Sequence, residues 1–150
     1  MSRASIRNRL DVVRKICRIW RLPFVIRWDR ALRSASDSRD WREVVKVAQH
    51  LHSRGLISRQ SRFLLGSAYL HLGDNEGAIR ELSTIVGRLR APEDEARRHL
   101  NLAIALRSVE RSPEAALLLR SQLLGSWPSR ERDKALRMLE EIGDLAPPIQ

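Results

Sequence analysis

One pattern of residues occurs twice in this chain, and the second copy lies 37 positions after the first. In order, the pattern is a leucine followed by a small residue, a large residue, an alanine and a leucine: Leu65, Gly66, Tyr69, Ala78 and Leu82, then Leu102, Ala103, Leu106, Ala115 and Leu119. Because two antiparallel helices approach closely only where the facing side chains are small, we expect Gly66 to meet Ala78 and Ala103 to meet Ala115. A period of about this length that is built from helix pairs predicts a solenoid of stacked helical hairpins.

Composition and turn residues favour an all-helical fold. Leucine, alanine and arginine are abundant, and no stretch alternates apolar and polar residues for long. Gly55, Gly73, Gly125 and Gly143 each follow a segment with helical periodicity, where a residue with a left-handed backbone often ends a helix. We therefore predict helices at residues 4–22, 25–36, 39–54, 58–72, 75–89, 93–108, 113–124 and 129–142.

Residues 62–92 resemble one tetratricopeptide repeat through residues at its usual positions: Leu65-Gly66, Tyr69, Gly73-Asp74, Ala78 and Pro92. Residues 99–128 resemble a second copy that closes at Pro128, although its turn departs from the Gly-Asp of the family. A poorer third copy spans about residues 25–54, with Val44 where an alanine is expected. The other interpretation of the same pattern is an irregular helical bundle.

The resemblance implies a right-handed solenoid of about three antiparallel helix pairs. We expect residues 1–24 to form a basic amphipathic helix, residues 25–142 to form the repeat domain with 129–142 as its capping helix, and residues 143–150 to form a tail. In this family the first helices of the pairs form a concave groove that binds other proteins. The groove residues that the resemblance implies are Arg33, Phe63, Ser67, Leu70, His71, Arg97, Leu100, Ile104 and Arg107.

These groove residues suit an extended or helical peptide that carries apolar side chains and carboxylates. We expect Arg97 and Arg107 each to meet a carboxylate of the partner through paired N–H donors. The alternative is that some of the set pack against the N-terminal helix or the next hairpin, with Phe63 and Leu70 the first to do so.

Positive charge is concentrated at the N-terminus, because the chain carries a net charge of +10 and residues 1–30 contribute +7 of it. An apolar stripe with spacings of three and four contains Ile6, Leu10, Val13, Cys17, Trp20 and Phe24. The opposite side is a candidate anion-binding surface made of Arg3, Arg7, Arg14, Lys15, Arg18 and Arg21. We favour docking of the stripe on the first repeat. The alternatives are attachment to an anionic membrane surface and nonspecific nucleic-acid or ribonucleoprotein binding, although no aromatic residue lies among these arginines to stack a base.

Residues that carry catalytic chemistry are sparse. His50 and His52 are two positions apart on one predicted helix, so they face different directions and cannot share a metal ion. His71 and His99 are isolated, and we expect them on a helix surface or in the groove; Cys17 is expected to be an ordinary buried thiol. The sequence has no phosphate-binding glycine loop and no nucleophile elbow. We predict a protein that is not an enzyme and that has no catalytic residue, metal ion or cofactor.

No apolar run approaches the ~20 residues needed to span a bilayer, and the N-terminal segment lacks the apolar core of a secretory signal. We therefore expect a cytoplasmic protein, with association on the cytoplasmic side of a membrane as the alternative. The predicted function is that of an adaptor or assembly factor that binds a peptide or helix of another protein within a larger complex. The positive charge would suit an acidic partner.

Overall fold

The computed structural model describes residues 23–145, and residues 1–22 and 146–150 lie outside the described part. Residues 23–37 are helical, and they are followed by α2 (Trp41–Ser53), α3 (Arg59–His71), α4 (Asn75–Ser83), α5 (Pro92–Ser108), α6 (Ser112–Leu123) and α7 (Ser129–Leu145). No strand occurs between residues 23 and 145. The predicted all-helical class is therefore confirmed for this part of the chain.

Polar side chains determine where the early helices begin. Asp40 Oδ1 and Asp74 Oδ1 each accept a hydrogen bond from the backbone N–H three residues later, at 3.1 and 2.8 Å, and thereby cap α2 and α4. Ser58 Oγ caps α3 in the same way at 3.0 Å. Gly55 and Gly73 follow α2 and α3 with φ angles of +63° and +83°, so the predicted left-handed residues are confirmed at these two helix ends.

The segment after α4 differs from the prediction. We predicted a helix through residue 89, but residues 84–91 form an irregular connection. Gly87 in this connection has a φ angle of +84°, which an α-helix does not contain. The spacing of Ile85 and Leu89 is helical, and both side chains are buried, but they reach the core from the connection. The four-residue spacing of these two buried side chains is therefore not accompanied by a helical backbone.

Of the last two predicted glycine terminators, Gly143 is wrong, and Gly125 follows its helix without the expected left-handed backbone. The helix α7 continues through Gly143 to its last residue, because an α-helix tolerates a glycine at a cost of about 1 kcal/mol and does not have to end there. Gly125 does follow α6, but without a positive φ angle. Its N–H donates to the carbonyl oxygen of Gln122 at 3.0 Å, which closes the turn with right-handed geometry.

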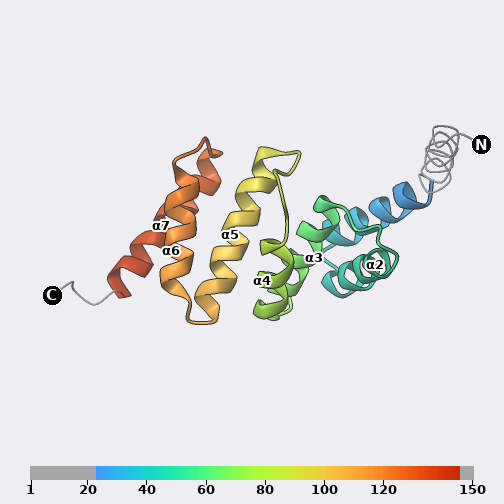
Figure 1. The fold of residues 1–150 in the computed structure, drawn as a ribbon, viewed down its shortest axis with the longest axis horizontal. Coiled ribbons are helices and arrows are strands. Elements are labelled where there is room, and N and C mark those ends of the chain that lie inside the picture. Colours follow the sequence, from blue (N-terminus) through green and yellow to red (C-terminus); the bar gives the residue numbers. More distant parts are fainter. Residues whose placement is uncertain (1–22, 146–150) are drawn as a thin grey trace, which may run out of the picture.

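Each labelled helix packs against the next one in the chain, and Figure 1 shows the helices following one another along the long axis of the molecule. In addition, α5 contacts both α3 and α7, whereas α4 contacts neither α2 nor α6 among the described helices. The helices α3, α5 and α7 therefore form one layer of neighbours, called here the inner layer. The helices α2, α4 and α6 lie together on one side of this layer.

The inner-layer helices are parallel to one another. Four side-chain pairs whose members are 34 positions apart join them: Gln60–Asp94 at 2.8 Å, Ser67–Asn101 at 3.0 Å, Arg97–Glu131 at 3.4 Å, and Arg107–Glu141. The first two pairs join α3 to α5, and the last two join α5 to α7. Because both members of a pair advance together along the chain, neighbouring helices of this layer run in the same direction.

Small residues permit close packing between the helices, although one predicted contact has a different partner. A Cβ atom placed on Gly66 would lie 2.6 Å from Leu82 Cγ, so α3 and α4 touch closely at this glycine. We predicted Ala78 as the neighbour, but the nearest α4 atoms belong to Leu82 and Glu81, about one turn further along that helix. Ala78 itself is fully buried.

The second copy of the repeated pattern is also in the core. Ala103 and Ala115 are fully buried and belong to one core cluster with Leu106, as their predicted role in helix packing requires. Tyr69 lies at the junction of the two core clusters and is partly buried. Its hydroxyl accepts a hydrogen bond from Gln49 Nε2 at 3.1 Å.

Candidate functional site

A groove with a volume of about 740 Å³ follows the inner layer. It is lined by side chains from the helical residues 23–37, from α3, α5 and α7, and by Trp41 at the start of α2. Six of the lining residues are apolar: Trp41, Phe63, Leu64, Leu100, Ile104 and Met138. Positions three or four apart share one face of a helix, so α3 contributes a continuous strip from Gln60 to His71.

The structure brings seven of the nine predicted groove residues together on this surface: Arg33, Phe63, Ser67, His71, Arg97, Leu100 and Ile104. Phe63 and Leu100 are each only 5% exposed, so they form the floor of the groove. Leu70 does not line the groove. It is partly buried and packs against the core, which agrees with the alternative that this residue packs within the protein.

The predicted role of two arginines needs correction. We expected Arg97 and Arg107 to meet carboxylates of a partner, but both are paired within the chain. Arg97 Nε lies 3.4 Å from Glu131 Oε1. Arg107 does not line the groove, and it forms an ion pair with Glu141 on α7. These contacts join neighbouring inner-layer helices, so both guanidinium groups already have a structural role.

Nine residues that line the groove were not predicted: Ser36, Asp37, Trp41, Gln60, Leu64, Asp94, Asn101, Lys134 and Met138. Gln60 precedes Phe63 by three positions and Asn101 follows Arg97 by four, so helical spacing from the predicted residues would have identified both. Lys134 and Met138 were missed for another reason: we treated residues 129–142 as a cap, whereas α7 forms part of the groove wall.

A second cavity of about 530 Å³ adjoins the groove and shares Trp41, His71, Arg97 and Lys134 with it. Arg39, Arg130 and Glu131 are its additional lining residues. The rings of Trp41 and His71 are stacked, with centroids 4.2 Å apart and planes inclined by 9°. A flat aromatic pair therefore lies among cationic side chains at the rim of the groove.

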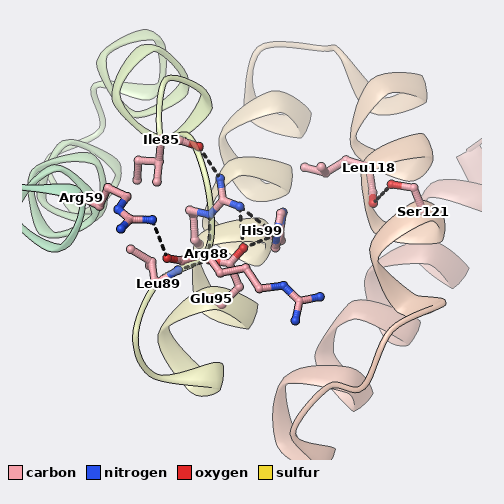
Figure 2. A network of polar contacts seen from close by, with 9 residues as sticks. Arg59, Ile85, Arg88, Leu89, Glu95, His99, Leu118 and Ser121 are labelled. Atoms are coloured by element: carbon pink, nitrogen blue, oxygen red, sulfur yellow. Dashed lines mark hydrogen bonds and ion pairs between the residues drawn. The ribbon is translucent and has the colours of Figure 1, made fainter.

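A polar network fixes the connection 84–91 to α5 (Figure 2). The Glu95 carboxylate accepts hydrogen bonds from Leu89 N at 3.0 Å and from Arg98 Nη2 at 2.6 Å. Arg98 Nη1 in turn donates to the carbonyl oxygen of Ile85 at 3.4 Å. Burial by itself would raise the pKa of Glu95, but the hydrogen bonds from Arg98 and Leu89 outweigh it and hold that pKa below its usual value.

His99 belongs to this network and not to the groove. We expected it on a helix surface or in the groove, but it is only 6% exposed, and its Nε2 lies 3.1 Å from Glu95 Oε1. Burial and the Arg98 cation lower the pKa of His99, and the nearby Glu95 carboxylate opposes them only in part. Its Nδ1 has no hydrogen-bond partner among the described residues. Burial and the Arg98 cation therefore favour the neutral form of His99.

The predicted anion-binding surface of the N-terminal helix lies outside the described residues, and so does Cys17. Phe24, the last residue of the predicted apolar stripe, is described: its ring contacts Trp28 and His50 at centroid distances of 5.8 and 6.3 Å. Between residues 23 and 145, no three His, Cys, Asp or Glu side chains are grouped so that they could hold a metal ion. None of the helices in that range is long and apolar enough to cross a membrane.

Comparison of the chain with protein-family models, with curated proteins and with solved structures found no match.

Proposed function

We propose that this protein is a non-enzymatic adaptor or assembly factor with the architecture of a tetratricopeptide-like solenoid. It binds a segment of another protein in the groove along α3, α5 and α7. The observation that carries the proposal is the parallel inner layer, in which alternate helices lie side by side and line one groove of about 740 Å³. Stacked helical hairpins use such extended concave surfaces to bind their partners.

The spacing of the elements supports the choice of repeat family. The side-chain pairs within the inner layer are 34 positions apart, and the tetratricopeptide repeat has a period of about 34 residues. The starts of α2 and α4 are also 34 positions apart, whereas those of α4 and α6 are 37 apart. The longer interval equals the period of the repeated sequence pattern, and its extra residues lie in α5, which has 17 residues against 13 in α3.

The chemistry of the groove fits a short stretch of polypeptide. Ile104 is 38% exposed and Met138 is half-buried, so both offer apolar surface to a side chain of the partner. Asn101 and Gln60 also line the groove, and their amide oxygens can accept hydrogen bonds from a peptide backbone. Apolar surface with a few polar groups is the usual composition of a binding site of this volume.

The experiment compares two substitutions that place a charge on exposed apolar surface. Ile104→Glu alters the groove, whereas Leu117→Glu alters the outward side of α6, where Leu117 is 70% exposed and lines neither the groove nor the cavity beside it. Tagged full-length protein is purified from its source cells, and the proteins that accompany it are quantified by mass spectrometry. Circular dichroism spectra of both variants establish that the helices are retained.

We expect Ile104→Glu to remove the specific partners and Leu117→Glu to keep them, because a carboxylate in the groove is desolvated by a bound apolar side chain. Equal recovery of partners by both variants would remove the groove from consideration. Loss of the partners with Leu117→Glu alone would move the binding surface to α6.

A further inference from the structure

Four basic side chains at the groove and its adjoining cavity have no ion-pair partner among the described residues. Of the cations that line these two surfaces, Arg97 is paired with Glu131 and with Asp94. No carboxylate of the described residues lies within 4.0 Å of the side-chain nitrogens of the others, which are Arg33, Arg39, Arg130 and Lys134. These four are called here the free cations.

Two of the three carboxylates on the same surfaces share Arg97 as their ion-pair partner. Asp94 accepts a hydrogen bond from Gln60 and lies 3.9 Å from Arg97, while the Glu131 side chain is 5% exposed and paired with Arg97. Asp37 is the remaining acidic residue that lines the groove. The two surfaces together carry five cationic and three acidic side chains, a net charge of +2. Residues 31–150 as a whole carry only +3, so most of their excess positive charge faces the proposed binding site.

The free cations stand on two walls of the site. Arg130 and Lys134 are one turn apart at the start of α7, whereas Arg33 and Arg39 belong to the segment before α2. Exposed apolar surface lies on the helices between these walls, at Ile104. A ligand that crosses the groove therefore meets positive charge, apolar surface and positive charge in turn.

We propose that the ligand of the groove is an acidic linear segment of a partner protein. Its carboxylates pair with Arg130 and Lys134 on one wall and with Arg33 and Arg39 on the other, and an apolar side chain between them packs on Ile104. This inference rests on the proposed function and names the chemistry of its ligand. Single-stranded RNA is the other polyanion to consider, but Trp41 and His71 stack on each other, so one face of each ring is already covered and withheld from a base.

The experiment selects ligands from a displayed library of random linear peptides, with the immobilised full-length protein as the target. We expect the selected peptides to be enriched in Asp and Glu around an apolar residue. Arg130→Glu/Lys134→Glu is the test variant, because both residues are exposed and neither forms an ion pair within the described part of the chain, so we expect the fold to stay intact. Its affinity for the best acidic peptide should fall at least about tenfold, because like charges then face each other across the interface.

A matched control changes the net charge by the same amount elsewhere. Arg90 and Arg120 are exposed and line neither the groove nor the adjoining cavity. Arg90→Glu/Arg120→Glu should bind the same peptide within about twofold of the original protein, since exposed charges that do not face the ligand are screened at physiological salt. An equal loss in both double variants would show that only the net charge matters, and the free cations would lose their assigned role.

The remaining outcomes separate this inference from the proposed function. If neutral or basic peptides are selected and Ile104→Glu abolishes their binding, the groove is a peptide site and the acidic ligand is wrong. If no peptide that depends on Ile104 is selected, the proposed function fails and the inference fails with it. A fluorescent polyuridylate RNA provides the third arm. Tight, salt-sensitive RNA binding that Arg130→Glu/Lys134→Glu removes and acidic peptides do not displace would assign these cations to nucleic acid instead.

Discussion

The contact between Gly66 and α4 makes a prediction whose sign depends on tertiary structure. Replacement of glycine by alanine inside a helix normally stabilises the helix by about 1 kcal/mol. At Gly66, however, the new Cβ atom would lie 2.6 Å from Leu82 Cγ and 2.7 Å from Leu82 Cδ2, and Leu82 is fully buried, so it cannot move aside freely. Overpacking of this kind costs about 1–3 kcal/mol. We therefore expect Gly66→Ala to lower the free energy of unfolding by about 1 kcal/mol, the difference between typical values of the two effects.

Gly143 is the matched control, because it lies inside α7 and an added Cβ atom there meets nothing within 4 Å. Gly143→Ala should raise the free energy of unfolding by roughly 0.5 kcal/mol, less than the full helix-propensity gain since the site is close to the helix end. Urea unfolding followed by circular dichroism measures both changes. In thermal unfolding, we expect Gly66→Ala to lower Tm by about 2–4 °C.

A double-mutant cycle with Leu82→Ala tests the cause. If the two side chains collide, Leu82→Ala should cost less stability in the Gly66→Ala background than in the original protein, with a coupling of about 0.5–3 kcal/mol. The reasoning is refuted if Gly66→Ala stabilises the protein as much as Gly143→Ala does, or if the cycle is additive.

The remaining predictions concern the network at the start of α5. Glu95→Gln removes the charged partner of Arg98, whose side chain is only 11% exposed. We therefore expect the free energy of unfolding in urea to fall by about 1–3 kcal/mol and hydrogen exchange at the Leu89 amide to become faster. Unchanged exchange would mean that Glu95 does not hold the connection in place. The pKa of His99 is lowered in the folded state, so the unfolded chain takes up the proton first as the pH falls. The free energy of unfolding should therefore decrease below about pH 6.5, by at most about 1.4 kcal/mol per pH unit from this residue. His99→Gln should flatten that dependence between pH 7 and pH 5.5, whereas an identical slope in both proteins would contradict the assignment. The lowered pKa of Glu95 acts in the same direction at more acidic pH, since stability is lost there as its carboxylate is protonated below about 4.5.

Much of the candidate site was predictable, because the resemblance to the tetratricopeptide repeat implies which face of each first helix lines a groove. Phe63, Ser67 and His71 were predicted in this way, and the structure places them on one wall of the groove. What local spacing could not indicate was which charged residues are already paired. Arg97 was predicted to be available to a ligand, but its partner Glu131 lies on a different helix, 34 positions away.

The connection at residues 84–91 shows the same division between local and distant causes. Periodicity in sequence reports which side chains are buried, and Ile85 and Leu89 are indeed buried. It does not report the backbone between them, because that is held in its irregular conformation by Glu95 on the next helix. The burial of His99 in the same network was unpredictable for the same reason.

The amino-acid sequence by itself determined the elements of this protein: helix caps such as Asp40 and Asp74, glycines that end α2 and α3, and small residues repeated at the period of helical hairpins. These features act within a few residues of one another, so they can be read from neighbours in the chain. Only the tertiary structure decided which partner Gly66 meets and that α7 completes the wall of the groove. The physical reason is that such contacts join residues far apart in sequence, and their geometry exists only once the helices have stacked.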